Sequence, residues 1–326
     1  MQSTDDPVPG TVRVRNARAE ATALLPPGTT ARVLEPSPPS NTDPQWYADD
    51  PTDPADAAGP LVTPIPGEGT EWSRLTGADQ VAYGARHWLD GRRRPAALPA
   101  SFVTSRDAIH QLAFYAVAPK RFEATGKLGL RYTSGGLGTP FFGDDEQVRV
   151  EGNTLVHQHG DQVRSAPLTT VRAATTFLGL DYRPVWFDGF HDPLSPADPD
   201  TPLEVDGAAA ASLADWFGFS THVLERARRA APDATRVQLW PEHLDPAFEM
   251  GDTDARASYG ASLGDAAHPE PYLYVAAWGT IDRSDRYWND QAFNGASLAY
   301  GLLLTADDPY DVALRFFADG HRRLTA

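Results

Sequence analysis

The sequence predicts an α+β protein with mainly antiparallel sheets, flanking helices, two lobes and an extended Pro-rich N-terminal arm. Two patterns carry this prediction. Short segments that alternate apolar and polar residues, as half-buried strands do, recur along the chain between Gly, Pro and Asp turns. Segments with the apolar spacing of a helix are fewer. Strands joined by short turns therefore outnumber strand–helix–strand crossovers, which favours antiparallel pairing.

Residues 1–70 are predicted to be an extended arm rich in Pro and Asp. They hold 13 of the 29 prolines and show little apolar periodicity, so they cannot form a core of their own. Residues 11–14 and 30–34 alternate and are expected to add short edge strands. Trp46 and Tyr47 favour an arm that docks on the body, because disordered segments are poor in aromatic residues. Disorder is the alternative.

Residues 71–190 are predicted to form the first α+β lobe. Thr76 is a suitable N-cap for a helix over 77–90, and Thr170 begins a second helix that Gly179 ends. Between these helices, period-two alternation predicts five strands with short turns, at 112–117, 127–132, 147–150, 154–157 and 162–164.

Residues 181–206 are predicted to be the loop between the lobes, because they hold seven acidic residues and five prolines. The second lobe, 205–326, begins with a helix over 208–231, and a final helix starts at the Asp308 cap and runs to Arg323. Strands are predicted at 236–240, 247–250, 256–259, 272–278 and 298–304. Each lobe thus follows the order helix, strands, helix, which suggests an internal structural duplication.

Charge and composition exclude several functions. The 28 Lys and Arg residues stand against 44 Asp and Glu residues, so phosphate backbones and anionic membranes are repelled and we expect no nucleic-acid or membrane partner. The absence of Cys excludes disulfides, Cys-type zinc sites and thiol nucleophiles. The N-terminus lacks the basic and apolar regions of a secretory signal, and the composition is typical of a GC-rich bacterial genome, so we expect a cytoplasmic bacterial protein.

The second predicted sheet brings together the groups best suited to chemistry. If its strands form an up-and-down meander, the connections 241–245 and 260–270 leave the same end of the sheet, because two reversals separate them. These connections would lie about two strand spacings apart, ~10 Å. They carry six residues that can bind a metal or transfer protons: Glu242, His243, Asp245, Asp265, His268 and Glu270.

Two roles are expected within this cluster. The candidate catalytic residues, for acid–base chemistry on a small molecule, are Glu242, His243, His268 and Glu270. The candidate ligands of a divalent metal, the cofactor that we consider, are His243, Asp245, Asp265 and His268. The spacing matches no metal signature such as HExxH, and ordinary turn capping by these side chains is the alternative.

Gly260-Ala261-Ser262-Leu263-Gly264 matches GxSxG and resembles the nucleophile elbow of α/β-hydrolases. The resemblance implies a nucleophilic Ser262 at a strand-to-helix turn, followed along the chain by an acid and a His. Pro269 and Pro271 stand where that helix should run, and the predicted sheet is not parallel. A flexible glycine turn is therefore the alternative.

Several longer segments are similar to uncharacterised hypothetical proteins of actinobacterial type. These segments are RVLEPSPP at 32–39, GKLGLRY and the residues that follow it at 126–143, WPEH at 240–243, and HPEPY at 268–272. The resemblance spans most of the chain. It implies neither an activity nor catalytic residues.

The sequence leaves three functional classes open. The first is a small-molecule enzyme that uses the His/Glu/Asp loop cluster for metal-assisted hydrolysis or other acid–base chemistry. The second is a non-catalytic small-molecule-binding or interaction protein. The third is a serine hydrolase that uses Ser262.

Overall fold

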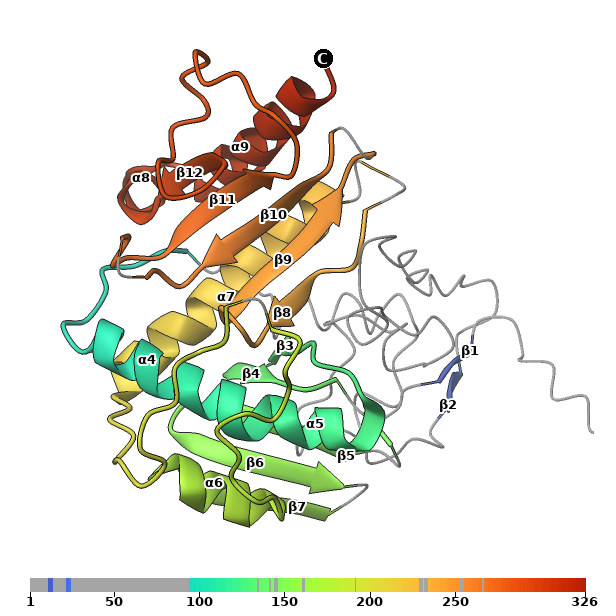
Figure 1. Cartoon of the computed structure of the whole chain (residues 1–326), viewed down its shortest axis with the longest axis vertical. Coiled ribbons are helices and arrows are strands. Elements are labelled where there is room, and N and C mark those ends of the chain that lie inside the picture. Colours follow the sequence, from blue (N-terminus) through green and yellow to red (C-terminus); the bar gives the residue numbers. More distant parts are fainter. Residues whose placement is uncertain are drawn as a thin grey trace, which may run out of the picture.

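The computed structural model describes residues 94–326, apart from 134, 141, 144–145, 160–161, 191, 229–230, 232–233, 253–254 and 266. It also describes β1 (Thr11–Arg13) and β2 (Thr22–Leu24), which pair as an antiparallel hairpin (Figure 1). β1 confirms most of the strand predicted at 11–14. The rest of the predicted arm, the strand at 30–34 and the helix at 77–90 lie outside the described residues.

The helices confirm three sequence predictions closely. The helix expected from Thr170 to Gly179 is present, with the Thr170 hydroxyl accepting the Ala173 N–H at 3.0 Å and Gly179 in the left-handed conformation. The long central helix and the last helix also begin at acidic caps, Asp206 and Asp308. The described helical segments are α4 (Phe102–Leu112), η2 (Ala113–Val117, a π-helical segment), α5 (Ala118–Thr125), α6 (Val171–Leu178), α7 (Gly207–Ala227), α8 (Tyr300–Thr305) and α9 (Pro309–Leu324).

The remaining strands form two five-stranded antiparallel sheets, which confirms the α+β class. Each sheet is a meander in which chain neighbours are also sheet neighbours, in the orders β3-β4-β5-β6-β7 and β8-β9-β10-β11-β12. The strands are β3 (Arg131–Thr133), β4 (Gly136–Gly138), β5 (Glu146–Glu151), β6 (Thr154–His159), β7 (Gln162–Pro167), β8 (Gln238–Trp240), β9 (Asp245–Met250), β10 (Ala257–Ser262), β11 (Tyr272–Ala277) and β12 (Gly295–Ala299).

An isolated antiparallel bridge joins the two sheets. The Leu130 N–H donates to the Leu239 carbonyl at 2.8 Å, and the Leu239 N–H donates to the Leu130 carbonyl at 2.9 Å. The bridge lies where β3 and β8, the first strands of the two meanders, approach each other. The two sheets therefore continue into one another through their first strands.

The register places the helices on one face of the joined sheets. Residues directly opposite each other in an antiparallel pair share a face, so Leu130 and Leu239 fix how the faces of the two sheets continue. On that face the Phe317 ring of α9 contacts Tyr259 of β10, and the Phe177 ring of α6 contacts His157 of β6. The opposite face of β9–β11 carries polar side chains, which include Asp245, Ser262, Tyr272 and Tyr274.

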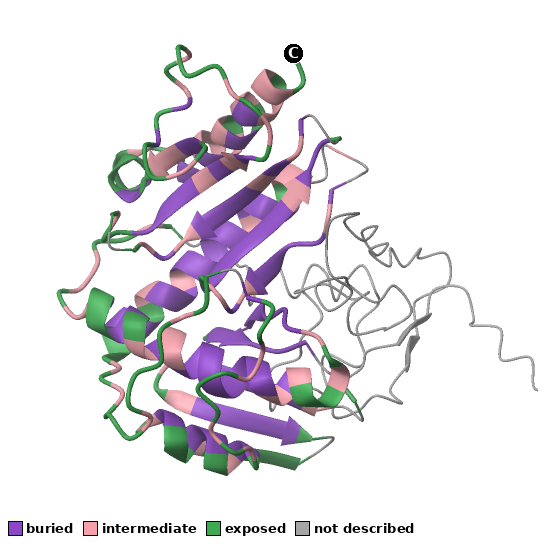
Figure 2. Ribbon diagram, in the orientation of Figure 1, coloured by how far each residue is buried: buried purple, intermediate pink, exposed green. Residues whose placement is uncertain are grey.

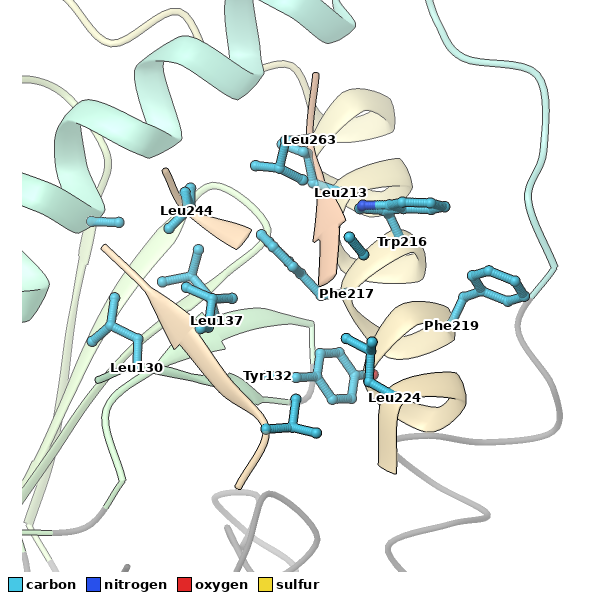
Figure 3. Packing of buried hydrophobic residues seen from close by; sticks show 14 of the residues in the cluster. Leu130, Tyr132, Leu137, Leu213, Trp216, Phe217, Phe219, Leu224, Leu244 and Leu263 are labelled. Carbon is cyan, nitrogen blue, oxygen red and sulfur yellow. The ribbon is translucent and has the colours of Figure 1, made fainter. Parts of the chain in front are cut away.

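The main core surrounds α7, which packs against β3 and β4 of one sheet and β9 and β10 of the other. Its apolar side chains point toward both halves, and one continuous cluster of buried residues spans them (Figure 3). Buried positions follow α7 and the strands, whereas the exposed positions lie mainly on outer helix faces and loops (Figure 2). The division into a 71–190 lobe and a 205–326 lobe stays a prediction, although each half has the order helix, five strands, helix.

Two strand predictions are wrong because the segments are helical. Residues 112–117 belong to the helical run from α4 through η2 to α5, and every one of them is buried. A fully buried segment shows no polar face from which to recognise the helical period. The strand predicted at 298–304 includes only the end of β12, because α8 begins at Tyr300. The strand predicted at 127–132 overlaps β3 only at Arg131 and Tyr132.

Candidate functional site

The predicted meander is present in the second sheet, and it brings the two predicted connections to one end. Strands β8 to β12 are neighbours in order, and all pairs are antiparallel. The β8–β9 turn at 241–244 and the β10–β11 loop at 263–271 therefore lie at the same end of the sheet. We call these two connections the rim. The Leu244 and Leu263 side chains anchor the two connections by pointing into the core near Leu213 and Phe217 (Figure 3).

Two side chains of helix α4 form hydrogen bonds to both connections of the rim. His110 Nε2 lies 3.0 Å from the Pro241 carbonyl and 3.1 Å from the Glu242 carbonyl, so this nitrogen carries the proton and donates. One helical turn earlier, Arg106 Nη1 donates to the Pro269 carbonyl at 3.3 Å. Burial lowers the pKa of His110 to about 4, which keeps the imidazole neutral at physiological pH.

The β8–β9 turn holds its two predicted residues, Glu242 and His243, in different environments. The Glu242 carboxylate is half-buried and accepts the backbone N–H of Asp192, from the loop that joins the two halves. His243 is exposed. Leu244 is fully buried and has a φ of +52°, a conformation that costs a non-glycine residue energy, so its packing holds the turn in a strained shape.

Asp245 is a buried carboxyl held by Tyr274. The Tyr274 hydroxyl donates to Asp245 Oδ2, and Asp245 Oδ1 has no hydrogen-bond partner within the part of the chain that the structure describes. Gly260 lies directly opposite Tyr274 in the β10–β11 pair, and the Tyr274 ring fills the space where a Cβ at Gly260 would stand. Burial raises the pKa of Asp245, and burial together with the neighbouring Asp245 raises the pKa of Tyr274.

His268 lies between two carboxylates. Its Nε2 is 3.4 Å from Asp290 Oδ2, its Nδ1 is 3.7 Å from Asp265 Oδ1, and its ring centroid is 4.6 Å from that of Tyr272. The Asp290 side chain is 1 % exposed, whereas the Asp265 side chain is 48 % exposed. Both His268 Nδ1 and Asp290 Oδ2 are buried, and neither has a hydrogen-bond partner of normal geometry among the described residues. The imidazole therefore has a buried carboxylate on one side and an open one on the other.

Asp265 shapes the β10–β11 loop. Its Oδ1 accepts the N–H groups of Ala267 and His268 at 2.7 and 2.8 Å, and its Oδ2 accepts the Tyr272 hydroxyl at 2.9 Å. Burial alone would raise the pKa of Asp265, but these donors lower it overall. Asp265 thus performs the turn capping that the sequence offered as an alternative to metal binding.

Ser262 does not stand at a strand-to-helix elbow. It is the last residue of β10, in an antiparallel sheet, and a loop follows it. Its hydroxyl accepts the Gly264 N–H at 3.0 Å and also hydrogen-bonds the Tyr272 phenol. The geometry that the α/β-hydrolase resemblance implies is therefore missing, although Ser262 is a neighbour of the Tyr272–Asp265 pair.

Among the residues that the structure describes, no group of three or more His, Asp or Glu side chains could hold a metal ion. The expected set of His243, Asp245, Asp265 and His268 is therefore not supported as a metal centre. The Asp245 carboxylate accepts a hydrogen bond from Tyr274, and the Asp265 carboxylate accepts hydrogen bonds from its own loop and from Tyr272. Glu270 is exposed on the same loop.

The sequence prediction missed three residues that organise the rim: Arg106, His110 and Asp290. The first two lie on α4. Arg106 and His110 are recognised as neighbours on one face only when the segment is known to be a helix. Asp290 lies in the connection between β11 and β12, where its N–H donates to the Gly295 carbonyl at 3.2 Å and its Oδ1 accepts the Ala292 N–H at 2.8 Å. No local pattern marks it, because only the tertiary fold brings it to His268.

Replacing Tyr274 with phenylalanine is expected to destabilise the protein by about 1–3 kcal/mol, because a buried carboxyl loses its hydroxyl donor. Tyr272→Phe on the same strand is the control. It should cost less, since the half-exposed Asp265 regains water as a partner. Urea unfolding at neutral pH measures both variants, and equal losses would contradict the buried Tyr274–Asp245 contact.

Comparison with family models, curated proteins and solved structures finds no match to this chain. The resemblance to actinobacterial hypothetical proteins stays a prediction. Within residues 94–326, in the portion described, no helix combines the length and apolar character needed to cross a membrane.

Proposed function

We propose that the protein is a small-molecule enzyme that performs acid–base chemistry at the rim, with His268 as the group that accepts and returns a proton. One observation carries the proposal: His268 Nε2 faces the buried Asp290 carboxylate, while Nδ1, which is buried 3.7 Å from Asp265 Oδ1, has no hydrogen-bond partner among the described residues. An imidazole with a carboxylate behind one nitrogen is oriented for proton transfer through the other.

The surroundings of Asp290 support this role. Arg283 Nη1 donates to the Asp290 carbonyl at 2.6 Å, and the Asp290 carboxylate is also held by the Ala292 N–H, so the loop presents it in a fixed position. The 3.4 Å between Asp290 and His268 is longer than a strong hydrogen bond, as catalytic pairs without substrate often are. Asp290 is accordingly a positioning residue, and His268 is the proposed catalytic residue.

The other predicted catalytic residues have subordinate roles in this proposal. Exposed His243 and Glu270, and half-buried Glu242, border the rim and would contact the parts of the substrate that do not react. Metal-assisted hydrolysis stays a variant of the proposal, to be tested by supplying the metal. The expected location is the cytoplasm of a bacterium, on the grounds of sequence alone.

A serine hydrolase is the second candidate, because Ser262 hydrogen-bonds Tyr272, whose hydroxyl contacts Asp265 beside His268. Along the chain the order Ser262, His268, Asp290 supplies the three residue types that such an enzyme uses. Labelling of the protein by a fluorophosphonate, abolished in Ser262→Ala and kept in Ser258→Ala, would favour this candidate over the first.

The test is a panel of small esters, amides and lactones, assayed with and without added Zn²⁺ or Mn²⁺. General acid–base catalysis contributes about 10²–10⁴-fold, so His268→Ala should lose at least about 100-fold of the turnover. His321→Ala, which removes a half-buried histidine next to Tyr259, is the matched control and should keep it. Full activity in His268→Ala would overturn the proposal. Tight binding of small molecules without turnover would favour the non-catalytic alternative.

A further inference from the structure

We propose that the substrate of the rim is a small molecule that carries a protonated amine or guanidinium group next to an apolar or aromatic part. This inference rests on the function proposed above, because it names the class of substrate for the same site. It follows from the charges around His268, from the buried Asp290 oxygen and from the rings that line β11.

The ionised groups of the rim are mainly negative. Glu242, Asp265, Glu270 and Asp290 all belong to the rim connections or face His268. The nearby guanidinium groups already have partners: Arg106 contacts Asp107 and the Pro269 carbonyl, and Arg283 donates to the Asp290 and Phe293 carbonyls. A phosphate or carboxylate would meet repulsion here, whereas a cation would be attracted.

One of these negative groups, the Asp290 carboxylate, is a buried hydrogen-bond acceptor. Among the described residues, Asp290 Oδ2 has no hydrogen-bond donor of normal geometry, and its side chain is 1 % exposed with the imidazole of His268 in front of it. A buried carboxylate oxygen without a well-placed donor costs free energy, which a charged donor close to it would recover. Asp265 is on the other side of the same imidazole, with a side chain that is 48 % exposed, and supplies the approach for such a donor.

Aromatic rings continue from this acidic group along the face of β11 opposite to the one on which α9 packs. His268 and Tyr272 have ring centroids 4.6 Å apart, Tyr272 and Tyr274 are 6.3 Å apart, and Tyr274 and Phe293 are 6.1 Å apart. Rings attract cations at their faces and bury apolar groups. Carboxylates beside a row of rings therefore match a ligand that is cationic at one end and apolar at the other.

The test compares benzylamine, benzyl alcohol and phenylacetate, which share a ring and differ in charge, by ligand-observed NMR titration of the intact protein. Benzylamine should bind at least ten-fold more tightly than benzyl alcohol, and phenylacetate should bind most weakly. Asp265→Asn, which keeps one side-chain oxygen to accept the Ala267 and His268 N–H groups, should reduce the affinity for benzylamine at least three-fold. The matched control is Asp311→Asn on α9, which removes a half-exposed acid paired with Arg315 and should leave the affinity unchanged.

Equal affinity for benzylamine and benzyl alcohol, tighter binding of phenylacetate, or an unchanged affinity in Asp265→Asn would overturn the inference. These outcomes differ from a failure of the proposed function. Binding is measured without turnover, so a wrong substrate class leaves the loss of activity in His268→Ala intact. If His268→Ala keeps its activity while the preference for benzylamine holds, the function fails and the rim is a cation-binding site.

Discussion

Replacing Gly264 with alanine is expected to destabilise the protein by about 3 kcal/mol and to disorganise the rim. Gly264 has a φ of +92°, which is unfavourable for any residue with a Cβ. An added Cβ would also stand 2.6–2.9 Å from the carbonyl oxygens of His268, Pro269 and Glu270. These are backbone atoms, and the Pro269 carbonyl accepts a hydrogen bond from Arg106. Moving the loop away from the added Cβ would therefore cost free energy.

Two other glycines separate the causes of this loss. Gly179 also has a positive φ but has open space around it, so Gly179→Ala should cost only the backbone strain, about 1 kcal/mol. Gly301 lies in α8 with open space and no positive φ, and Gly301→Ala should be neutral or stabilising by up to about 1 kcal/mol. Denaturant unfolding of the three variants should give this order, and a Gly264→Ala loss no larger than that of Gly179→Ala would contradict the close approach of the carbonyls.

The second large effect is a loss of stability in acid that depends on His110. Its pKa is about 4 in the folded protein, against about 6.5 when unfolded, so the unfolded state takes up the proton first as pH falls. The stabilisation is complete above pH 6.5 and is lost as pH falls toward 4. A difference of about 2.5 pH units corresponds to about 3 kcal/mol.

His110→Gln should flatten this part of the stability profile, since a glutamine amide can donate to the Pro241 and Glu242 carbonyls without titrating. Asp107 and His243 act on His110 with opposite signs and are unchanged in the variant. Urea unfolding between pH 7.5 and 4 measures the slope. His159→Gln, an exposed histidine of β6, should keep the wild-type slope. Parallel profiles for the wild type and His110→Gln would show that His110 is not buried as a neutral imidazole.

Much of the fold is predictable from local signals, and the errors have a physical cause. Caps and end signals at Thr170, Gly179 and Asp308 mark real helix ends, and alternation finds β5 to β7 and most of the second meander. The segment 112–117 is missed because it is buried on all sides, so neither a period of two nor one of 3.6 is visible.

The rim is only partly predictable. Topology alone places Glu242, His243, Asp245, Asp265, His268 and Glu270 at one end of the sheet, and the structure confirms that placement. The distances between the side chains of the rim do not follow from this topology. Gly260 leaves room for the Tyr274 ring, whose hydroxyl donates to Asp245. Asp290, which lies near His268, belongs to a loop with no recognisable motif. Pairwise contacts between distant segments are set by packing, which no local pattern encodes.

The bridge between Leu130 and Leu239 has a consequence for how this molecule melts. Either half alone would expose a strand edge and the side of α7 that packs on the other half, so neither is expected to survive as an independent folding unit. Heating should then abolish both meanders in one cooperative step. A nick in the acidic 181–206 connection should leave the fragments associated rather than release two small domains.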